Sequence, residues 1–353
     1  MRTNRVILNV MLGCGKGGLE SVFVQHAISF RDLGYKSLAV CPPKSPYVGQ
    51  LHAAGIETLT MGNRWWNVGA WIRWICILKQ CRPDVVCMHG NRAISFGIAR
   101  WVRLFVRSLP KLIATTHNVR NKRFKHLDGC FAITHVLEKS LINDFEIPAS
   151  RVFYCPNAVP SPKVFEARKY RTPLTIGFLR RLHPEKGGDI MLEACRILKR
   201  KGVAFRLEMA GDGPLRAQYQ KFVKENQLEK EVTFCGWLGE NDKEDFFKRI
   251  DILCLPSRKE GLPIALLEGL ACAIPIVVSS HPGMMEVLEQ APCGIAFPME
   301  DVAALAEALK KMSEDPILWE YYSLAARKVF EENYSTDIQK LYLDKGIQTV
   351  CAL

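Results

Sequence analysis

The sequence predicts an α/β protein with two domains, and three observations support this prediction. Short apolar segments rich in β-branched residues alternate with longer segments of helical periodicity along almost all of the 353 residues, which is typical of parallel sheets with crossover helices. A proline-rich segment at residues 156–162 interrupts the alternation near the middle of the chain. The charge is also uneven, because residues 1–170 carry a net +15 and the remainder carries −3. The two halves are therefore expected to have different partners.

The first half of the chain contains seven candidate strands separated by helical segments. The strands are expected at residues 6–11, 37–41, 57–61, 85–88, 111–115, 129–133 and 151–155. The helices are expected at residues 19–33, 68–81, 93–107 and 136–143. Short apolar strands joined by helices predict a parallel sheet that is covered on both faces.

A linker and a second alternating region follow. Three prolines within residues 156–162 do not fit a helix interior or a central strand, so a linker is expected there. Further strands are expected at residues 174–179, 204–210, 232–234, 252–255, 274–278 and 294–297. Only helices are expected after residue 301, and the last of them is expected at residues 334–350.

Composition excludes several classes of protein. The 13 cysteines include no C-x-x-C pair, and most lie in apolar segments such as residues 85–87, which predicts buried thiols rather than disulfides or a zinc site. The N-terminal apolar segment is too short for a signal peptide. The longest apolar stretch, residues 261–278, contains Glu268 and two prolines, so no membrane-spanning helix is expected. A cytoplasmic protein is expected.

Two features of the first half lie at strand ends, where open α/β sheets bind ligands. Gly17 and Gly18 close a glycine-rich turn that opens a helix, whose free N–H groups can bind an anion. The turn matches neither a P-loop nor a dinucleotide-binding fingerprint, and a simple strand-to-helix turn is the alternative. His117 follows the expected strand 111–115. A hydrogen-bonded polar residue without a further role is the alternative for His117.

Charged residues gather at the strand ends of the second half. Arg181 and Lys186 lie on one strand-to-helix loop, where two cations can reach one diphosphate. Gly211 belongs to a second glycine turn that opens a helix. Glu260 precedes an apolar helix, and Glu268 lies inside it. A buried carboxylate needs hydrogen-bond donors, which a ribose diol would supply; a solvent-facing Glu268 is the alternative.

The frame E-G-L-P-x-x-L-L-E-x-L-A, which runs from Glu260 to Ala271, resembles the E-x7-E motif of retaining glycosyltransferase family 4. Further matches follow in the family's order: Gly17–Glu20, His117, Pro156 with Asn157, Arg181 with Lys186 and Gly187, Gly211–Gly213, and Gly283 with Glu286 and Val287. Two positions depart from the family's pattern. Arg180 stands where the family usually has glycine before the arginine, and Ala158 stands where glycine usually follows Pro-Asn.

The resemblance implies the GT-B fold, in which two Rossmann-like domains face each other across a cleft. The expected bounds are residues 1–160 for the acceptor-side domain, 161–173 for the linker, 174–333 for the nucleotide-sugar-binding domain and about 334–353 for the returning helix. The implied donor is a nucleotide sugar, with a UDP-sugar favoured by family frequency and GDP-mannose as another possibility. No permanently bound cofactor and no metal are expected.

The resemblance also implies a role for each site residue. Arg181, Lys186 and the N–H groups near Gly261 and Leu262 would neutralise the charge that develops on the leaving diphosphate. Glu260 would hydrogen-bond hydroxyls of the transferred sugar, and a covalent nucleophile is the alternative for this residue. Glu268 would bind the ribose hydroxyls, and Gly211 would contact the donor. His117, together with Gly17 and Gly18, would lie against the transferred sugar.

The basic first half indicates an anionic partner. Arg100, Arg103 and Arg107 share one face of an expected helix beside a tryptophan-rich segment, which favours contact with an anionic membrane surface. A crossover helix that shows its arginines to water is the alternative, and nucleic acid is a competing partner without a recognisable fold signature. The basic group Arg120, Lys122 and Arg123 could meet phosphates of a lipid-linked acceptor.

The sequence therefore predicts a retaining glycosyltransferase that acts on a membrane-associated glycan or glycolipid, such as lipopolysaccharide or another surface polysaccharide. It would lie on the inner face of the plasma membrane. Two alternatives are open: a GT-B enzyme that does not transfer to an acceptor, such as a nucleotide-sugar epimerase or a phosphorylase, and a binding protein that has lost activity.

Overall fold

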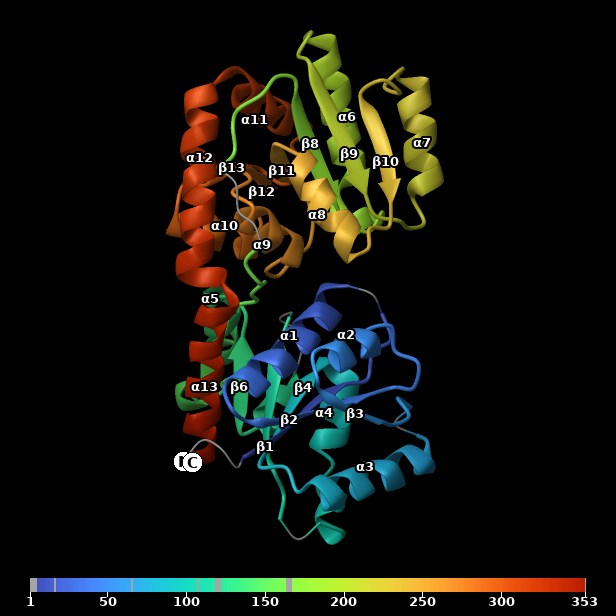
Figure 1. The fold of residues 1–353 in the computed structure, drawn as a ribbon, viewed down its shortest axis with the longest axis vertical. Helices are drawn as coiled ribbons and strands as arrows, with labels where there is room; N and C mark the ends of the chain where they lie inside the picture. The colour runs from blue at the N-terminus through green and yellow to red at the C-terminus, as the bar shows by residue number, and fades with distance from the viewer. Residues whose placement is uncertain are drawn as a thin grey trace. The chain divides into compact units, whose positions relative to one another are not determined.

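The computed structural model describes residues 5–15, 17–64, 66–106, 108–117, 122–162 and 167–352, with the side chains of Arg100, Glu240 and Asn241 left out (Figure 1). The chain divides into two compact units. Unit 1 comprises Met1–Ala158 and Thr336–Leu353, and unit 2 comprises Val159–Ser335. Each unit is built around one parallel sheet.

Unit 1 contains a seven-stranded sheet in the order β3-β2-β1-β4-β5-β6-β7. Its strands are β1 (Val6–Met11), β2 (Lys36–Cys41), β3 (Glu57–Thr60), β4 (Val85–His89), β5 (Lys111–Thr116), β6 (Gly129–Ala132) and β7 (Val152–Tyr154). Every neighbouring pair in this sheet is parallel. The inner strands β1 and β4 are buried and mostly apolar, with Asn9 and His89 as their polar residues, because helices cover both faces of the sheet.

The helices of unit 1 include one from the far end of the sequence. They are α1 (Gly18–Asp32), α2 (Val48–Ala53), α3 (Val68–Cys81), α4 (Gly90–Gly97), α5 (His135–Asn143) and α13 (Thr336–Ala352). Helix α13 packs beside α1 and against β6 and β7, and Leu343 and Ile347 enter the same core as Phe131. Tyr35 donates a hydrogen bond of 2.6 Å to Asp344 of α13.

Unit 2 contains a six-stranded parallel sheet in the order β10-β9-β8-β11-β12-β13. Its strands are β8 (Leu174–Leu179), β9 (Phe205–Ala210), β10 (Val232–Gly236), β11 (Ile252–Leu255), β12 (Ile276–Ser279) and β13 (Gly294–Phe297). Its helices are α6 (Gly188–Arg200), α7 (Arg216–Glu225), α8 (Glu240–Arg249), α9 (Ile264–Ala271), α10 (Pro282–Gln290), α11 (Val302–Glu314) and α12 (Pro316–Val329). The core of unit 2 includes Phe178 and Trp319, and the indole N–H of Trp319 donates to the carbonyl of Asp251.

Both sheets have a topological switch point beside their first strand. In unit 1 the chain moves outward from β1 through β2 and then returns to β4, and in unit 2 it moves outward from β8 and returns to β11. Loops diverge at such a point, so the crevice outside the carboxyl ends of the two flanking strands is where this topology binds ligands. Ligand-binding residues are therefore expected on the loops after β1 and β4 and on those after β8 and β11.

All thirteen strands expected from the sequence are present, with bounds that agree within two residues. One expected helix is wrong. The segment 93–107 is not a single helix, because α4 ends at Gly97, a 3-10 turn (η1) covers Arg100–Leu104, and β5 begins at Lys111. The arginine face that we expected to unite Arg100, Arg103 and Arg107 on that helix is therefore not formed; Arg107 lies outside the described residues.

Two further expectations concern the whole chain. Among the described residues no helix has the length and hydropathy needed to cross a bilayer. The cysteines are all unpaired, and seven of the thirteen are buried, including Cys87 and Cys254 on central strands. Burial raises the pKa of the Cys87 thiol to about 12, as expected for a thiol packed as a small apolar side chain.

Candidate functional site

The switch point of unit 2 brings three charged side chains together. Arg180 follows β8 directly, Lys186 ends the 3-10 turn η4 (Pro184–Lys186), and Glu260 lies in the loop between β11 and α9. The Lys186 Nζ donates a hydrogen bond of 2.7 Å to Glu260 Oε1, and the Arg180 Nε lies 3.5 Å from the same oxygen. Ser257 Oγ also donates to Glu260 Oε1 at 3.1 Å.

These side chains are largely withdrawn from water. Their exposed fractions are 8% for Arg180, 14% for Lys186 and 11% for Glu260. Burial alone would raise the pKa of Glu260, but the positive charges of Arg180 and Lys186 outweigh it and hold that pKa below its ordinary value. Glu260 is therefore ionised at neutral pH, and the cluster carries one excess positive charge.

His281 lies against the backbone of the same loop. The Glu260 N–H points to His281 Nε2 at 3.4 Å, so this nitrogen accepts and Nδ1 carries the proton in the neutral ring. Burial lowers the pKa of His281, which favours the neutral form. His281 Nδ1 is buried and has no hydrogen-bond partner in the structure.

Two glycines allow the loops of this site to approach each other. Gly187 has φ +69°, and a Cβ there would lie 1.9 Å from the carbonyl oxygen of Pro256. A Cβ at Gly283 would lie 2.0 Å from the carbonyl oxygen of Gly261. Only glycine fits both positions, and this close packing holds Lys186 beside the loop that carries Glu260. The half-buried Gly261 and the buried Leu262 then lead into α9.

Gly211 supports the loop after β8 from the side of β9. Its φ is +130°, and a Cβ there would lie 1.8 Å from the carbonyl oxygen of Arg180. The Arg180 N–H in turn donates to the carbonyl of Ala210 at 2.9 Å. The structure thus gives Gly211 a definite packing role, and its predicted contact with the donor remains a prediction.

The arginine beside Glu260 is not the one that the sequence pattern singled out. Arg181 is exposed, whereas the side chain of Arg180 is only 8% exposed and lies next to the carboxylate. The predicted contact of Arg181 with the diphosphate stays a prediction. Spacing alone could not separate two adjacent arginines, because their difference in burial arises from packing. Sequence reasoning also missed Ser257 and His281, neither of which belongs to a charged pair.

Glu268 lies inside α9, as expected, with 19% of its side chain exposed. Its Oε1 accepts a hydrogen bond of 3.0 Å from Lys243 of α8. This partner could not be predicted from the sequence, since the two residues are on different helices. Binding of ribose by Glu268 remains a prediction, with Lys243 as a neighbour of that carboxylate.

His117 lies at the carboxyl end of β5 in unit 1, near His89 at the end of β4. Their ring centroids are 6.4 Å apart. Burial lowers the pKa of His117 to about 4, so the ring is neutral at physiological pH. Its Nε2 is buried and has no hydrogen-bond partner among the described residues, which do not include residues 118–121. Gly17 is the N-cap of α1 and Gly18 its first residue; both are exposed.

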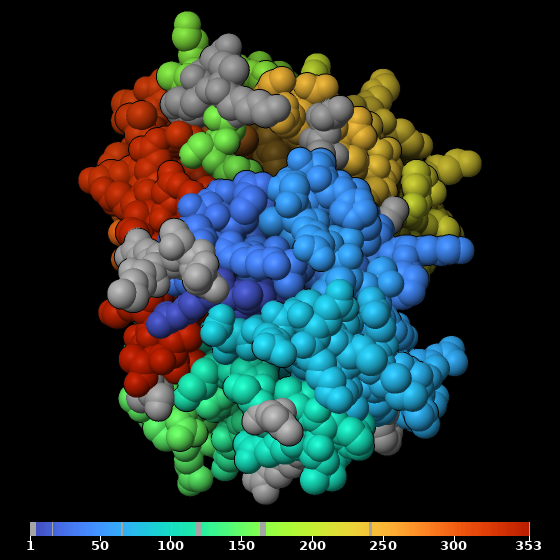
Figure 2. Space-filling view, turned by 60° about the horizontal axis from the view of Figure 1, so that its bottom comes forward, coloured from blue at the N-terminus to red at the C-terminus, as the bar shows by residue number. Residues whose placement is uncertain are grey.

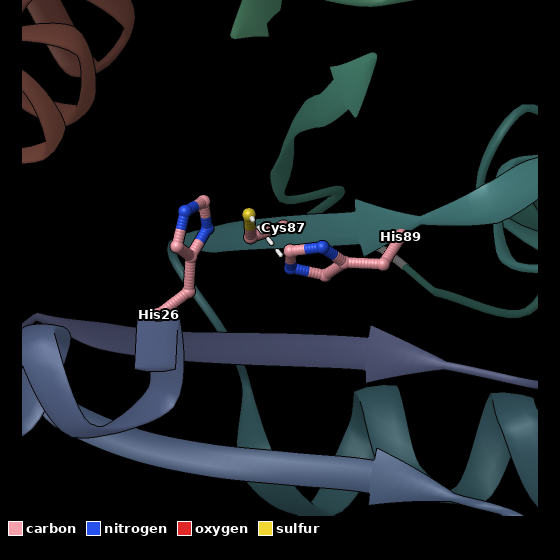
Figure 3. A group of neighbouring side chains, drawn as sticks. All are labelled: His26, Cys87 and His89. Atoms are coloured by element: carbon pink, nitrogen blue, oxygen red, sulfur yellow. Dashed lines mark hydrogen bonds between the residues drawn. The ribbon is translucent and has the colours of Figure 1, made fainter. Parts of the chain in front are cut away.

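Three buried side chains of unit 1 are close enough together to share an ion: His26, Cys87 and His89. In the described part of the chain they are the only such group of His, Cys or acidic side chains. Figure 3 shows the three side chains pointing toward one another, with His26 on α1 and the other two on β4. His89 Nε2 lies 3.9 Å from Cys87 Sγ and 2.9 Å from Asn9 Oδ1.

The hydrogen bonds of Asn9 decide which His89 nitrogen carries the proton. Asn9 Nδ2 donates to the carbonyl of Phe23 at 2.8 Å, so Asn9 Oδ1 must accept from His89 Nε2. The nitrogen that faces Cys87 is therefore protonated and offers no lone pair to an ion. We assign these three side chains to the core of unit 1, and metal independence remains a prediction.

The basic residues expected to contact an acceptor lie on the surface of unit 1. Lys122 and Arg103 are exposed. Arg123 is exposed and its Nη1 donates to Ser95 Oγ at 2.5 Å. Arg120 and Arg107, like the side chain of Arg100, lie outside the described residues, so their expected role stays a prediction.

Two family matches cover nearly the whole of this architecture. Residues 16–161 match the family described as Glycosyltransferase Family 4, and residues 162–329 match the family described as Glycosyl transferases group 1. The chain belongs to glycosyltransferase family 4. The two matches meet at the proline-rich segment, so each half of the enzyme family corresponds to one sheet.

Relatives of known name support the same assignment. A segment of 149 residues is 36% identical to the putative colanic acid biosynthesis glycosyltransferase WcaL of Escherichia coli strain K12, and covers 40% of this chain and 37% of that protein. A segment of 172 residues is 34% identical to the amylovoran biosynthesis glycosyltransferase AmsK of Erwinia amylovora, and covers 47% and 42%. The matched segments thus span less than half the length of these relatives.

Solved structures show the fold of the family 4 enzyme. The Anabaena protein Alr3699/HepE, in complex with UDP and glucose, aligns with a TM-score of 0.81 at 15% identity, over 98% of this chain and 99% of that one. The lipopolysaccharide outer core galactosyltransferase WaaB aligns with a TM-score of 0.75 at 17% identity, over 98% and 99%. The predicted GT-B fold class is confirmed, with a parallel α/β sheet in each half.

Proposed function

We propose that this family 4 enzyme is a retaining glycosyltransferase that transfers a sugar from a UDP-sugar to a membrane-associated glycan or glycolipid, such as lipopolysaccharide or another surface polysaccharide. The observation that carries the proposal is the buried cluster of Arg180, Lys186 and Glu260 at the switch point of unit 2. It combines an excess positive charge with an ionised carboxylate at the position where this topology binds nucleotides.

The cluster suits the chemistry of sugar transfer from a diphosphate. When the bond between the anomeric carbon and the phosphate oxygen breaks, negative charge develops on the leaving nucleoside diphosphate. Fixed cations in a poorly hydrated site stabilise that charge without reorganising, and Lys186 and Arg180 are placed to do so. The N–H groups at the start of α9, near Gly261 and Leu262, would add to this stabilisation.

The two glutamates would bind hydroxyl groups. Glu260 is ionised, so its carboxylate accepts hydrogen bonds from hydroxyls of the transferred sugar, and Glu268 would accept those of the ribose. Retention follows if the acceptor hydroxyl attacks the face that the phosphate leaves. The new bond forms between the acceptor oxygen and the anomeric carbon, and the acceptor's proton passes to the departing phosphate oxygen.

The names of similar proteins support the donor and acceptor classes. One solved structure of the HepE protein is a complex with UDP-glucose, and it aligns over the whole of both chains. WcaL and AmsK are named for the biosynthesis of colanic acid and amylovoran, and WaaB for the lipopolysaccharide outer core. These names favour UDP as the nucleotide and a surface glycan as the acceptor.

An exposed aromatic patch on unit 1 supports a membrane-associated acceptor. We call the following residues of α3, its preceding loop and η1 the aromatic patch: Trp66, Val68, Ile72, Trp101, Leu104 and Phe105. Leu104 is 82% exposed and Trp66 is 66% exposed. Trp71 of α3 connects the α3 part of the patch to the η1 part, since the centroid of its ring lies 4.8 Å from that of Trp101. Figure 2 shows α3 and the segments that follow it on one continuous face.

The chemistry of the aromatic patch matches a membrane interface. Exposed arginines at positions 64, 73 and 103 are close to its residues in the sequence, and Arg64 lies over the ring of Trp66. Exposed tryptophan and leucine side chains bordered by arginine insert at the level of lipid headgroups, and anionic lipids strengthen the contact. A patch of this kind is uncommon on a protein surface that stays in water.

Donor use can be tested by measuring nucleoside diphosphate release. The enzyme is incubated with UDP-glucose, UDP-galactose, UDP-N-acetylglucosamine or GDP-mannose, in the presence and absence of a bacterial glycolipid extract. We expect UDP release from one UDP-sugar that rises when the extract is added, together with an α-linked product by NMR. Isomerised nucleotide sugar without UDP release would instead indicate an epimerase, and exclusive use of GDP-mannose would contradict the choice of UDP.

Membrane contact can be tested by flotation with vesicles of phosphatidylcholine alone or with one third phosphatidylglycerol. We expect binding to the anionic vesicles that decreases in high salt, and a roughly tenfold loss in the double variant Trp101→Ser/Leu104→Ser. Leu324→Ser is the matched control, since Leu324 is an exposed leucine of unit 2. Equal binding by both variants would contradict the proposed contact surface.

A further inference from the structure

We propose that Arg180 binds the distal phosphate of the nucleoside diphosphate, in addition to the cation supplied by Lys186. The inference rests on the proposed function and assigns a ligand-binding role to a residue at which this chain departs from its family's pattern. It concerns residues of unit 2 alone, where Arg180, Lys186 and Glu260 converge after β8 and β11.

The guanidinium group of Arg180 is buried but incompletely hydrogen-bonded. Only 8% of this side chain is exposed, yet its Nε and Nη2 are buried without a hydrogen-bond partner in the described part of the chain. Buried donors are nearly always satisfied in folded proteins, because an unpaired one forfeits its bonds to water. A ligand that brings oxygen atoms to this position would remove that deficit.

Glu260 does not complete the pairing of the Arg180 guanidinium group. The Arg180 Nε lies 3.5 Å from Glu260 Oε1, and this oxygen already accepts shorter hydrogen bonds from Lys186 and Ser257. One carboxylate thus faces two cations, and a positive charge is left over. Phosphate oxygens supply both the missing charge and two acceptors with the spacing of a guanidinium fork.

The backbone holds Arg180 in a fixed place. The Arg180 N–H donates to Ala210, and Gly211 packs directly on the Arg180 carbonyl. The residue follows β8, the strand beside which the sheet reverses its order, so its side chain starts at the switch point. His281, the N-cap of α10, adds a further buried donor, Nδ1–H, beside the loop that carries Glu260.

The test compares UDP and UMP binding by isothermal titration calorimetry, because the two nucleotides differ by the distal phosphate. We expect Arg180→Gln to weaken UDP binding at least tenfold and UMP binding less than threefold, so that the preference for UDP over UMP collapses. Arg180→Lys keeps the charge but loses the fork, and we expect it to retain part of that preference. Arg196→Gln is the matched control, since Arg196 pairs with Glu193 on the outer helix α6.

The outcomes separate this inference from the proposed function. If wild type binds UDP and Arg180→Gln keeps the wild-type preference for UDP over UMP, the role of Arg180 is overturned while the proposed function stands. An equal loss for UDP and UMP would likewise overturn a contact with the distal phosphate. If wild type binds neither UDP nor GDP, both proposals fall. If Arg180→Gln does not fold, judged by near-ultraviolet circular dichroism, Arg180→Lys decides. An unchanged preference of this variant for UDP over UMP would overturn the proposed contact between the guanidinium group and the distal phosphate.

Discussion

The two sheets share a topology but gather different chemistry at their carboxyl ends. In unit 2 the loops after β8 and β11 bring together Arg180, Lys186 and Glu260, all charged and largely buried. In unit 1 the ends of β4 and β5 carry His89 and His117, which burial keeps neutral. The same architecture thus builds an ionic site in one unit and an uncharged polar site in the other.

The proposed function accounts for this difference by the groups that each site would bind. A diphosphate carries formal charge, and only fixed cations offset the cost of removing it from water. Hydroxyl groups of sugars need hydrogen-bonding partners but no counter-charge, and a neutral imidazole such as His117 can both donate and accept.

The largest expected effect is that of removing the negative charge of Glu260. We expect Glu260→Gln to lower kcat about 10³-fold, the size found for removal of one electrostatic contact to a transition state, because the sugar hydroxyls lose their ionised acceptor. UDP affinity should hold or increase, since two cations then face the phosphates without a competing carboxylate. UDP release and calorimetric binding measure the two quantities.

The control for that prediction is Glu289→Gln, a change of the same kind on the exposed end of α10. It should leave kcat and UDP affinity unchanged. A Glu260→Gln enzyme with weaker UDP binding and normal kcat would contradict the assignment of Glu260 to the sugar. It would also remove the contrast between an ionic and an uncharged site.

The next effect concerns the packing that holds the ionic site. We expect Gly211→Ala to lower the free energy of unfolding by about 3 kcal/mol, through backbone strain and a direct clash with the Arg180 carbonyl. Gly202→Ala is the matched control, because Gly202 has φ +71° with no atom within 4 Å of its Cβ position; strain alone should cost about 1 kcal/mol there. Urea unfolding followed by circular dichroism distinguishes the two, and equal losses would contradict the clash.

The strands could be predicted from sequence because central parallel strands are buried on both faces. Leu174–Leu179 and Ile252–Leu255 were expected with the bounds that the structure shows, since uninterrupted apolar segments between turn residues leave little ambiguity. The helix expected at residues 93–107 failed for a tertiary reason. A Cβ at Gly97 would lie 2.4 Å from Met88 Sδ, so α4 ends where it packs closely on β4, and apolar periodicity beyond Gly97 carried no information on this contact.

The candidate site was predictable in its chemistry but not in its pairings. The spacing of Lys186, Glu260 and Glu268 placed all three residues on the elements where the structure has them. The burial of Arg180 rather than Arg181 depends on the position of the loop against β9 and β11, and the contact of Lys243 with Glu268 depends on how α8 lies beside α9. Neither relation is encoded in the distance along the chain.

The buried neutral histidines of unit 1 predict that the stability of this unit is sensitive to acid. Burial lowers the pKa of His26 to about 3, whereas an unfolded histidine titrates near 6.5. Below pH 6.5 the unfolded state therefore binds a proton that the folded state does not. The free energy of unfolding decreases as the pH falls, until the pKa of the folded state is reached. Between pH 7.5 and pH 5.0 we expect His26 alone to remove about 2 kcal/mol.

The measurement is urea unfolding at pH 7.5 and pH 5.0, followed by tryptophan fluorescence, since five of the seven tryptophans are in unit 1. His26→Leu should reduce the difference between the two pH values by about 2 kcal/mol, whatever its effect on stability at either one. His89 and His117 shift in the same direction, so part of the acid sensitivity should remain. An unchanged difference would show that His26 does not titrate as a buried neutral group.

The smallest expected effect concerns the edge of the ionic site. Glu268 is already paired with Lys243 at 3.0 Å, so its carboxylate would bind ribose hydroxyls while keeping this partner, and its net contribution to affinity is modest. We expect Glu268→Gln to weaken UDP binding about tenfold, near 1.4 kcal/mol, and to weaken binding of 2′-deoxy-UDP by less than that. If the variant loses the same affinity for both nucleotides, Glu268 serves the packing of α8 on α9 rather than the ribose. The ionic site would then recognise the phosphates and the transferred sugar, without a contact to the ribose from Glu268.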